Sequence, residues 1–482
     1  MLASRKPYRE KTYLIAAGGC KLDTAIFDKK DAAPQATVVL FPGLVANKKV
    51  MAFLAAGFAE LNLRVYVPDL PGHGHSPGPF SPQRAEDCAE ALVSGLVSRG
   101  LAVPDRTILA GHSMGAAIAL RVGAKVPVAG VVAISPAPMR AAYGVQPEML
   151  LYQDPGPMPE RFLVLSGGRE PESMRGNARD LVASAKNGVA QYLVIPGATH
   201  SSLIFSRPAV RAFQGWTAKA FELQGTPGMP SLGELYGALA GFAGLLLLAG
   251  PFLREITGTK QTGERETAAG NSFAWARMLP EFAVAAILVV ILLRFWSPLD
   301  ALRLYEGDYL ASFLLILGIV LASLHWKSLQ EQFSRWKPGL LVAIFAALIL
   351  FLLFSAWLEL SVYEAWLTPT RWARFPFLLL AFLPYHIAEE LCLGPANADP
   401  RRRLVAGLSL RAAAWLALVI GLLYFHSGEI LMVLLLPYFV VLQVLERSAM
   451  DIVRHETGSA AATAAFGAIL LTGFCLVIFP VT

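Results

Sequence analysis

Long apolar runs in the second half of the sequence most constrain what this chain can fold into. From about Leu232 onward, apolar segments recur that are each close to the length that crosses a bilayer. Hydrophobic residues make up 55% of the chain and charged residues only 16%, and the mean hydropathy is +0.51. These values lie outside the range of soluble globular proteins. The sequence therefore predicts an integral membrane protein.

The apolar runs predict about eight membrane spans. The expected spans are residues 232–253, 279–296, 309–326, 339–360, 374–393, 404–425, 428–446 and 460–480. Trp and Tyr residues stand at several of their ends, as is typical of the membrane–water interface. No internal repeat is apparent in this half of the chain.

The first half has an ordinary soluble composition, with charges and Pro/Gly turns throughout. Short β-rich runs alternate there with helical patterns, which predicts a doubly wound, mostly parallel sheet covered by helices. After a leading hairpin, the expected strands are 36–41, 64–69, 107–111, 128–135, 161–167 and 191–197. We therefore expect two domains, an α/β domain at 1–225 and an all-α membrane domain at 226–482.

The stretch Gly111-His112-Ser113-Met114-Gly115 carries the clearest chemical signal. It fits the pattern G-x-S-x-G between an expected strand and an expected helix. Glycines are needed because the turn is tight, and a side chain at either end would collide with neighbouring backbone. The serine hydroxyl is exposed at the carboxyl end of the strand and at a helix N-terminus, which favours developing negative charge.

Three further features occur in the order expected for a serine nucleophile. "FPGL" ends the strand at 36–41, so the backbone N–H groups of Leu44 and Met114 are candidates for an oxyanion hole. "SGGREPES" follows a later strand and offers Glu170, and "PGATHSS" follows the last strand and offers His200. The order Ser, acid, His is the one found in α/β-hydrolases.

Residues 12–222 resemble α/β-hydrolases of the lysophospholipase, monoacylglycerol-lipase and serine-aminopeptidase type. "DLPGHGHSPG" at 69–78 is similar to the D-x-P-G-x-G-x-S loop of that family. The resemblance implies that Ser113 is the nucleophile, His200 the base and Glu170 the acid. It covers slightly less than half of the chain. Two features depart from the family pattern: the acid is Glu where Asp is commoner, with Glu172 close enough to compete, and no His precedes the glycine of "FPGL".

These motifs predict a membrane-embedded serine hydrolase that cleaves an ester through an acyl-enzyme, with a lipase, lysophospholipase or esterase as the nearest description. One alternative is an acyltransferase or peptidase with the same triad. Another is a transporter or sensor with a hydrolase-like domain that is not catalytic. The segment between the strands at 130–135 and 162–166 is short, so at most a small lid is expected there. The bilayer is then a natural source of substrate.

"FLPYHIAEELCLG" (382–394) is the sharpest feature of the membrane half. His386, Glu389 and Glu390 have the spacing i, i+3, i+4 and share one helical face. A metal or proton site is one interpretation, and the Glu pair is similar to that of intramembrane CAAX-type proteases, although Gly394 stands where their arginine is expected. We favour the other interpretation, a polar helix end neutralised by the arginines at 401–403.

Two features of the sequence disagree about the orientation of the chain in the membrane. Loops 254–278, 327–338, 394–403 and 447–459 are the basic ones, and the positive-inside rule places them in the cytoplasm. With eight spans, the hydrolase would then lie outside. Yet the first residues have no apolar stretch of signal-peptide type, which favours a cytoplasmic hydrolase. The two signals agree if 232–253 is re-entrant or interfacial, and we expect the cytoplasmic placement.

Composition excludes several other functions. The four cysteines, Cys20, Cys88, Cys392 and Cys475, show no CxxC pattern, so we expect neither a disulfide framework nor a zinc site. The net charge of +6 comes without a Lys/Arg block, so no nucleic-acid partner is expected. We expect no cofactor and no metal. The expected partners are membrane lipids and an apolar ester or lipid substrate, and the sequence leaves the oligomeric state open.

Overall fold

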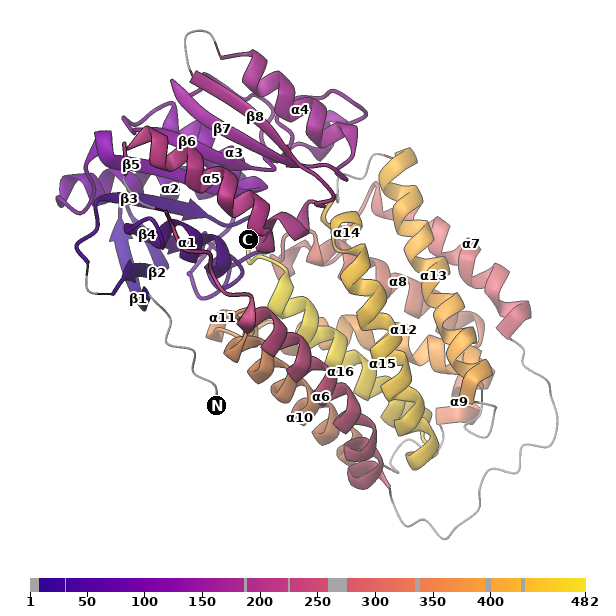
Figure 1. Cartoon of the computed structure of the whole chain (residues 1–482). Coiled ribbons are helices and arrows are strands. Elements are labelled where there is room, and N and C mark those ends of the chain that lie inside the picture. The colour runs from indigo at the N-terminus through magenta and orange to yellow at the C-terminus, as the bar shows by residue number, and fades with distance from the viewer. Residues whose placement is uncertain are drawn as a thin grey trace. The chain divides into compact units, whose positions relative to one another are not determined.

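The computed structural model describes residues 8–30, 32–185, 189–223, 226–258, 275–333, 339–394, 400–425 and 430–482. The chain forms two compact units (Figure 1). The first unit contains Met1–Ala238 together with two distant segments, Glu359–Glu364 and Pro480–Thr482. The second unit contains Leu239–Leu358 and Ala365–Phe479.

An eight-stranded sheet forms the centre of the first unit, in the order β1-β2-β4-β3-β5-β6-β7-β8. The strands are β1 (Tyr8–Ala17), β2 (Cys20–Lys29), β3 (Ala36–Phe41), β4 (Leu63–Pro68), β5 (Thr107–His112), β6 (Gly130–Ile134), β7 (Arg161–Gly167) and β8 (Val189–Ile195). Strands β1 and β2 form an antiparallel hairpin, β2 pairs antiparallel with β4, and every pairing from β4 to β8 is parallel. The expected mostly parallel sheet is confirmed.

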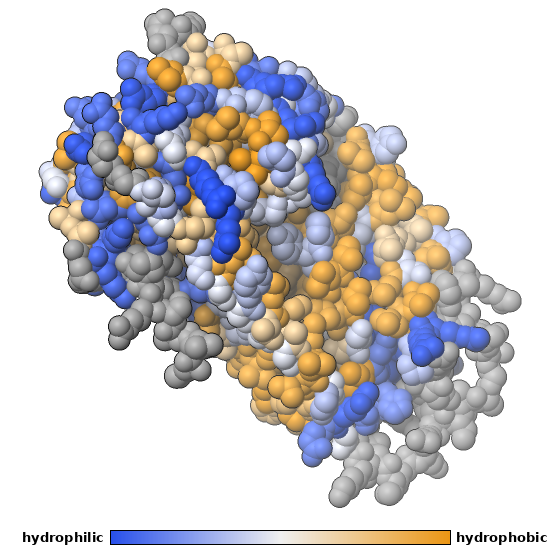
Figure 2. Space-filling view, in the orientation of Figure 1, coloured by the Kyte–Doolittle hydropathy of each residue, from blue (hydrophilic) through white to orange (hydrophobic). Residues whose placement is uncertain are grey.

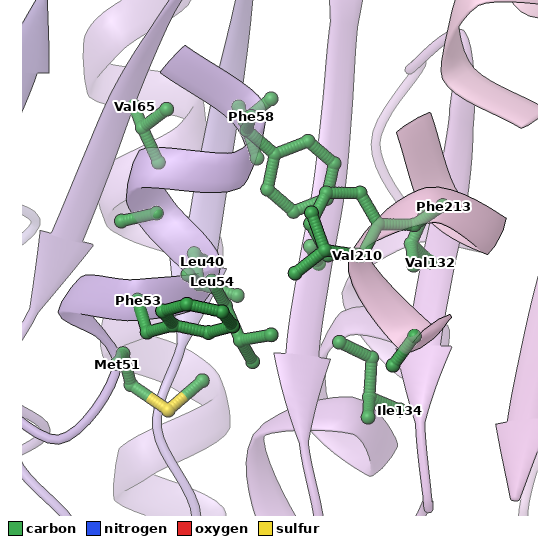
Figure 3. Packing of buried hydrophobic residues seen from close by; sticks show 14 of the residues in the cluster. Leu40, Met51, Phe53, Leu54, Phe58, Val65, Val132, Ile134, Val210 and Phe213 are labelled. Atoms are coloured by element: carbon green, nitrogen blue, oxygen red, sulfur yellow. The ribbon is translucent and has the colours of Figure 1, made fainter. Parts of the chain in front are cut away.

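The helices of this unit are α1 (Ala52–Ala59), α2 (Pro82–Ser98), α3 (Met114–Gly123), α4 (Glu172–Ala183) and α5 (Arg207–Ala220). Helices α1 and α5 pack against each other over one face of the sheet, where Phe58 stacks on Phe213 with ring centroids 4.0 Å apart (Figure 3). Central strands are buried on both faces and read as continuous apolar runs, such as "ATVVLF" in β3. This core fixes the carboxyl ends of the parallel strands at one edge.

The connection from β6 to β7 confirms the expected shortness of any lid. All of its residues are described, and the only regular element among them is a 3₁₀ helix at Pro147–Met149. A helical cap over the strand edge would have to be built from this connection. The edge is therefore not covered by a cap of its own.

Two distant segments complete the first unit. At the end of the described chain, Val481 makes a bridge with the loop that follows β4: its N–H donates to Gly72 O at 3.1 Å, and its carbonyl accepts from Phe80 N at 2.7 Å. The segment Glu359–Glu364 contacts the turn after β3. Neither segment was expected to belong to this unit.

The expectation of no disulfide is wrong. Cys20, which begins β2, is bonded to Cys88 of α2, with Cα atoms 5.6 Å apart. The two cysteines are separated by 68 positions, and only the packing of α2 beside the hairpin brings them together. Cys392 and Cys475 are free and buried in the second unit.

The second unit is entirely helical in its described residues. Its long helices are α6 (Gly233–Thr257), which starts in the first unit, α7 (Trp275–Leu293), α8 (Gly307–Leu324), α10 (Leu340–Leu360), α12 (Phe375–Leu393), α13 (Pro400–Phe425), α15 (Leu436–Thr457) and α16 (Ala460–Ile478). Short helices lie at α9 (Trp326–Phe333), α11 (Pro369–Trp372) and α14 (Ile430–Leu434).

Six of these helices are long and apolar enough to cross a membrane, namely α6, α8, α10, α12, α13 and α16. Side chains such as Leu247 and Leu341 are more than two thirds exposed, which suits contact with lipid rather than water. Figure 2 shows hydrophobic residues gathered over the helices of this unit.

Two of the eight expected spans differ from this description. The apolar part of α7 is shorter than the others, at Met278–Leu293. The expected span at 428–446 is not one apolar helix: the described chain there forms α14 and then α15, which runs on to Thr457 and carries buried Glu446 and Arg447. The charged residues Glu446 and Arg447 of α15 pair with residues of other helices, and they interrupt its apolar run well before the helix ends.

We expect the Cys20–Cys88 bond to stabilise the first unit by restricting its unfolded chain. For a loop of this length, removing the bond should lower the free energy of unfolding by about 2–4 kcal/mol. Urea unfolding of the Cys88→Ser variant in detergent, followed by pulse proteolysis of the first unit, measures this. Reductant should lower the urea midpoint of the wild type to that of the variant and leave the midpoint of the variant unchanged. Equal midpoints for the two oxidised proteins would contradict the expectation.

Candidate active site

The turn between β5 and α3 forms because its two glycines allow backbone to approach backbone. A Cβ atom on Gly111 would lie 2.1 Å from the carbonyl oxygen of Gly115, and one on Gly115 would lie 2.2 Å from the carbonyl oxygen of Phe41. Ser113, between them, has φ 56° and ψ −120°, a conformation that L-residues rarely adopt. Its N–H donates to Ile134 O at 3.0 Å, and its carbonyl accepts from Ala137 N at 3.0 Å. The strained turn is thereby fixed from the neighbouring strand.

The turn after β3 lies directly against this serine. A Cβ atom on Gly43 would be 3.1 Å from Cβ of Ser113. Leu44 follows in the same turn, and Ala46 N donates to Gly43 O at 3.1 Å. Met114 opens α3, so its N–H belongs to the first helical turn, which has no intrahelical acceptor. The two backbone segments proposed for the oxyanion hole thus adjoin Ser113 from opposite sides.

Glu170 and His200, which follow β7 and β8, are hydrogen-bonded to each other. His200 Nδ1 lies 3.1 Å from Glu170 Oε1. The other carboxylate oxygen, Oε2, accepts from the backbone N–H of Gly167 at 2.8 Å. The side chain of Glu170 is fully buried, whereas that of His200 is 23% exposed. The buried acid therefore orients a partly accessible imidazole.

Ser135 is part of this group, and sequence reasoning did not identify it. It follows β6, is buried, and has φ 47°. Its hydroxyl donates to Glu170 Oε1 and lies 2.7 Å from His200 Nδ1. A polar residue directly after a buried parallel strand at the same edge was the available signal.

These contacts determine which nitrogen of His200 carries the proton. The hydroxyl hydrogen of Ser135 is used on Glu170, so both the hydroxyl oxygen and the carboxylate act as acceptors for His200 Nδ1–H. The Nε2 atom is then left with a lone pair, which is the tautomer that a general base needs. Among the described residues, Ser113 Oγ and His200 are not joined by a hydrogen bond. Catalytic hydrogen bonds often tighten only when substrate binds.

His112, the residue before Ser113, binds the backbone of His200. Burial, with the nearby His200 ring, lowers the pKa of His112 to about 3. It is therefore neutral, and its Nε2–H donates to the carbonyl of His200 at 3.0 Å. This bond fixes the backbone of His200.

Glu172, the competing acid, is not in this group. It opens α4, is 46% exposed, and pairs with Arg179 and with Arg175 of the same helix. It lies two residues beyond Glu170, and its carboxylate is engaged by arginines of its own helix.

A second polar cluster surrounds Lys48, beyond the turn after β3. The Lys48 ammonium pairs with Asp69 at 2.7 Å, with Asp23 at 3.2 Å and with Glu364. Asp69 also accepts from the backbone N–H groups of Lys48 and His75, so it braces its loop. Oxygen and nitrogen atoms of Asp23, His75 and Glu364 lie within 4.8 Å of one another, a spacing that suits a metal ion. Since Lys48 already supplies the cation, we assign no metal to this cluster.

His386, Glu389 and Glu390 share a face of α12, as predicted, and are fully buried. Glu389 forms a two-pronged ion pair with Arg411 of α13, at 2.6 and 2.9 Å, and Glu390 pairs with Arg403 and Arg447. His386 Nε2 lies 2.7 Å from Glu446 of α15. The favoured interpretation was right about Arg403 but missed Arg411 of α13 and Arg447 of α15. Arg401 and Arg402 are exposed.

The fold, the strained serine turn and the order of residues along the strand edge agree with one family. Residues 38–185 match the model of the alpha/beta hydrolase family. The first unit has the α/β-hydrolase fold, and we refer to it as the hydrolase domain. The uncharacterized protein Rv2307c of Mycobacterium tuberculosis is 28% identical over 195 residues, which cover 38% of this chain and 69% of that protein.

Solved structures similar to this domain include XC6422 of Xanthomonas campestris, described as an a/b serine hydrolase without lid. It is 19% identical, covers 45% of this chain and 97% of that chain, and has a TM-score of 0.36. A thermostable esterase from Pseudomonas putida is 13% identical, covers 46% of this chain and 85% of that chain, and has a TM-score of 0.37.

The two acids at the end of β7 are separable by experiment. Glu170→Gln removes the charge that stabilises the imidazolium, so we expect ester turnover to fall by about 10²–10⁴-fold. Glu172→Gln is the matched control, and its turnover should stay near that of the wild type. The measurement is kcat on a p-nitrophenyl ester in detergent. Loss of turnover only in Glu172→Gln would reverse the assignment.

Proposed function

We propose that this chain is a membrane-embedded serine hydrolase that cleaves an ester, with Ser113 as nucleophile, His200 as base and Glu170 as acid. The observation that carries the proposal is the hydrogen-bonded group of Glu170, Ser135 and His200 at the strand edge that bears the strained Ser113 turn. A serine hydroxyl is a weak nucleophile near neutral pH and needs such a base.

The reaction follows from the positions of these groups. Ser113 Oγ attacks the carbonyl carbon while its proton passes to His200 Nε2, and Glu170 stabilises the imidazolium. The tetrahedral oxyanion accepts hydrogen bonds from the N–H groups of Leu44 and Met114. The C–O bond to the alcohol then breaks, and the alcohol leaves with the proton from His200. Water, deprotonated by His200, attacks the acyl-enzyme and releases the acid and free Ser113.

An apolar ester or lipid is the proposed substrate. The chain carries six helices that are apolar and long enough to hold it in a bilayer, where lipid esters are concentrated. The connection from β6 to β7 carries no helical cap in its described residues, so a long acyl chain has access to the strand edge. If an alcohol or amine attacked the acyl-enzyme in place of water, the enzyme would be an acyltransferase. If the same triad formed the acyl-enzyme from an amide, the enzyme would be a peptidase.

A fluorophosphonate probe tests the proposal, because it reacts covalently only with an activated serine. We expect membranes with the wild-type chain to be labelled on this protein. Ser113→Ala should abolish labelling, and Ser173→Ala, a serine of α4 outside the group, should retain it. Labelling that persists in Ser113→Ala would refute the assignment of the nucleophile. Lack of labelling in the wild type would favour a ligand-binding domain of a transporter or sensor.

We also propose that the hydrolase domain lies on the non-cytoplasmic side of the membrane, opposite to the placement expected from the N-terminal residues. That expectation required 232–253 to be re-entrant or interfacial, whereas α6 is one continuous apolar helix of 25 residues, long enough to cross, and a crossing α6 favours the opposite placement. The Cys20–Cys88 disulfide supports the same side, since disulfides persist in oxidising compartments.

The three chain segments that make up the first unit agree with this orientation. Glu359–Glu364 and Pro480–Thr482 belong to it, so the chain must return to the same side at both points. Four long helices precede the first return (α6, α7, α8, α10) and four precede the second (α12, α13, α15, α16). Both returns are satisfied when α7 and α15, which are not among the six candidate spans, also cross. The basic loops then all lie on the opposite side, which the positive-inside rule assigns to the cytoplasm.

Thiol labelling of intact cells distinguishes the two orientations. Glu148→Cys places a thiol on the exposed 3₁₀ helix of the hydrolase domain, and Arg402→Cys places one at the exposed start of α13. A membrane-impermeant maleimide should label Glu148→Cys in intact cells and Arg402→Cys only after permeabilisation. The reverse pattern would establish the cytoplasmic placement. The wild type is the control, since its own cysteines are bonded or buried.

A further inference from the structure

The segment Glu359–Glu364, which ends α10 and enters the following loop, contacts both the loop after β4 and the turn after β3, and three of its contacts lie in that turn. Tyr363 Oη donates to the carbonyl of Val45 at 2.5 Å. Glu364 pairs with Lys48, and Glu359 pairs with Lys49 at 2.5 Å and accepts a second bond from it through its carbonyl. All three contacts fall on the five residues from Val45 to Lys49.

Those five residues continue the turn that carries Leu44. Val45 has φ 59°, a left-handed conformation that a β-branched residue adopts at a cost and holds only when its surroundings impose it. On one side the turn lies against Ser113 through Gly43. On the other side it is held by Tyr363 and by the Lys48 cluster. The direction of the Leu44 N–H therefore depends on both supports.

The Lys48 cluster is built to be rigid. Asp69 binds both the backbone N–H and the ammonium of Lys48, at 2.7 Å each. A Cβ atom on Gly74 would lie 2.2 Å from Glu364 Oε2 and 2.4 Å from Asp69 Oδ2, so the two carboxyl groups close around a glycine with φ 47°. The side chains of Lys48, Asp69 and Glu364 are all nearly inaccessible to water.

Protonation of Glu364 explains how two carboxyl groups share this space. Burial, and then the neighbouring Asp69, raises the pKa of Glu364 to about 9. Burial also opposes ionisation of Asp69, but the hydrogen bond from Glu364 and the charge of Lys48 hold the pKa of Asp69 below its usual value. Glu364 is therefore a neutral acid near pH 7 that donates to the Asp69 carboxylate and accepts from Lys48.

We propose that Tyr363 and Glu364 are positioning residues for the oxyanion hole: they hold the turn from Leu44 to Lys49 so that the Leu44 N–H points at the oxyanion that forms on the Ser113 adduct. This inference rests on the proposed serine hydrolase function and gives the membrane part of the chain a role in catalysis besides anchoring. An oxyanion donor acts only in the transition state, so loosening its support lowers kcat and leaves KM nearly unchanged.

Kinetics of the full-length chain in detergent on p-nitrophenyl butyrate test the proposal. Tyr363→Phe removes one oxygen atom, and we expect kcat to fall by about 10- to 100-fold with KM within about twofold of the wild type. Glu364→Ala should have the same effect. Glu364→Gln, which keeps the shape and both hydrogen bonds of the neutral acid, should restore kcat to within about threefold of the wild type. Tyr143→Phe and Glu148→Gln are matched controls on exposed parts of the hydrolase domain, and they should retain the wild-type kcat.

Hydrogen exchange gives a readout that does not depend on activity. In Tyr363→Phe, amides of residues 43–49 should exchange faster than in the wild type, while those of β5 and α3 stay protected. A wild-type kcat in Tyr363→Phe with unchanged exchange would overturn the proposal. Faster exchange with unchanged kcat would overturn the catalytic role of the segment while leaving Ser113 chemistry intact. If Ser113→Ala retains ester turnover, the proposed function fails instead, and that result is separate from the exchange experiment.

Discussion

The closest backbone approach in the hydrolase domain, at Gly111 and Gly115, is the constraint on which the rest of the site depends. There is no room for a side chain where the turn after β5 meets the end of β3. Because the two backbones touch, Ser113 is forced into its strained conformation, and the turn carrying Leu44 is brought against it. The parallel register then places the ends of β6, β7 and β8 beside this point, so each strand contributes one polar residue to the same edge.

Buried charge organises the chain in a second way. In the helical unit, buried Arg403, Arg411 and Arg447 face Glu389, Glu390 and Glu446, with Asp451 bonding two of the arginines. Removing one member would leave an uncompensated charge in a medium of low dielectric constant, which costs far more than the pair contributes. The network therefore fixes the register of α12, α13 and α15 more strictly than their apolar surfaces would. We assign it a structural role.

The sequence was most informative where chemistry is local. The strand-turn-helix at Ser113, and Glu170 and His200 at later strand ends, were predictable because alternating elements of a parallel sheet bring their carboxyl ends to one edge. Ser135 was missed because a serine after a strand resembles any turn residue until its hydrogen bonds are seen. The Cys20–Cys88 bond, and the membership of Glu359–Glu364 in the first unit, depend on contacts between residues far apart in sequence, which no local pattern encodes. Glu359 and Glu364 had only their positions at a span end to identify them.

The bridge between Val481 and the loop after β4 has a consequence for how the chain is made. A ribosome delivers the eight strands early, but the hydrogen bonds of Val481 to Gly72 and Phe80 form only after every helix of the second unit has been synthesised. The same holds for Tyr363 and Glu364, which follow the first four long helices. Assembly of the first unit is thus completed only after the helices of the second unit have been synthesised, and a chain that stops earlier lacks the segments that finish its loops.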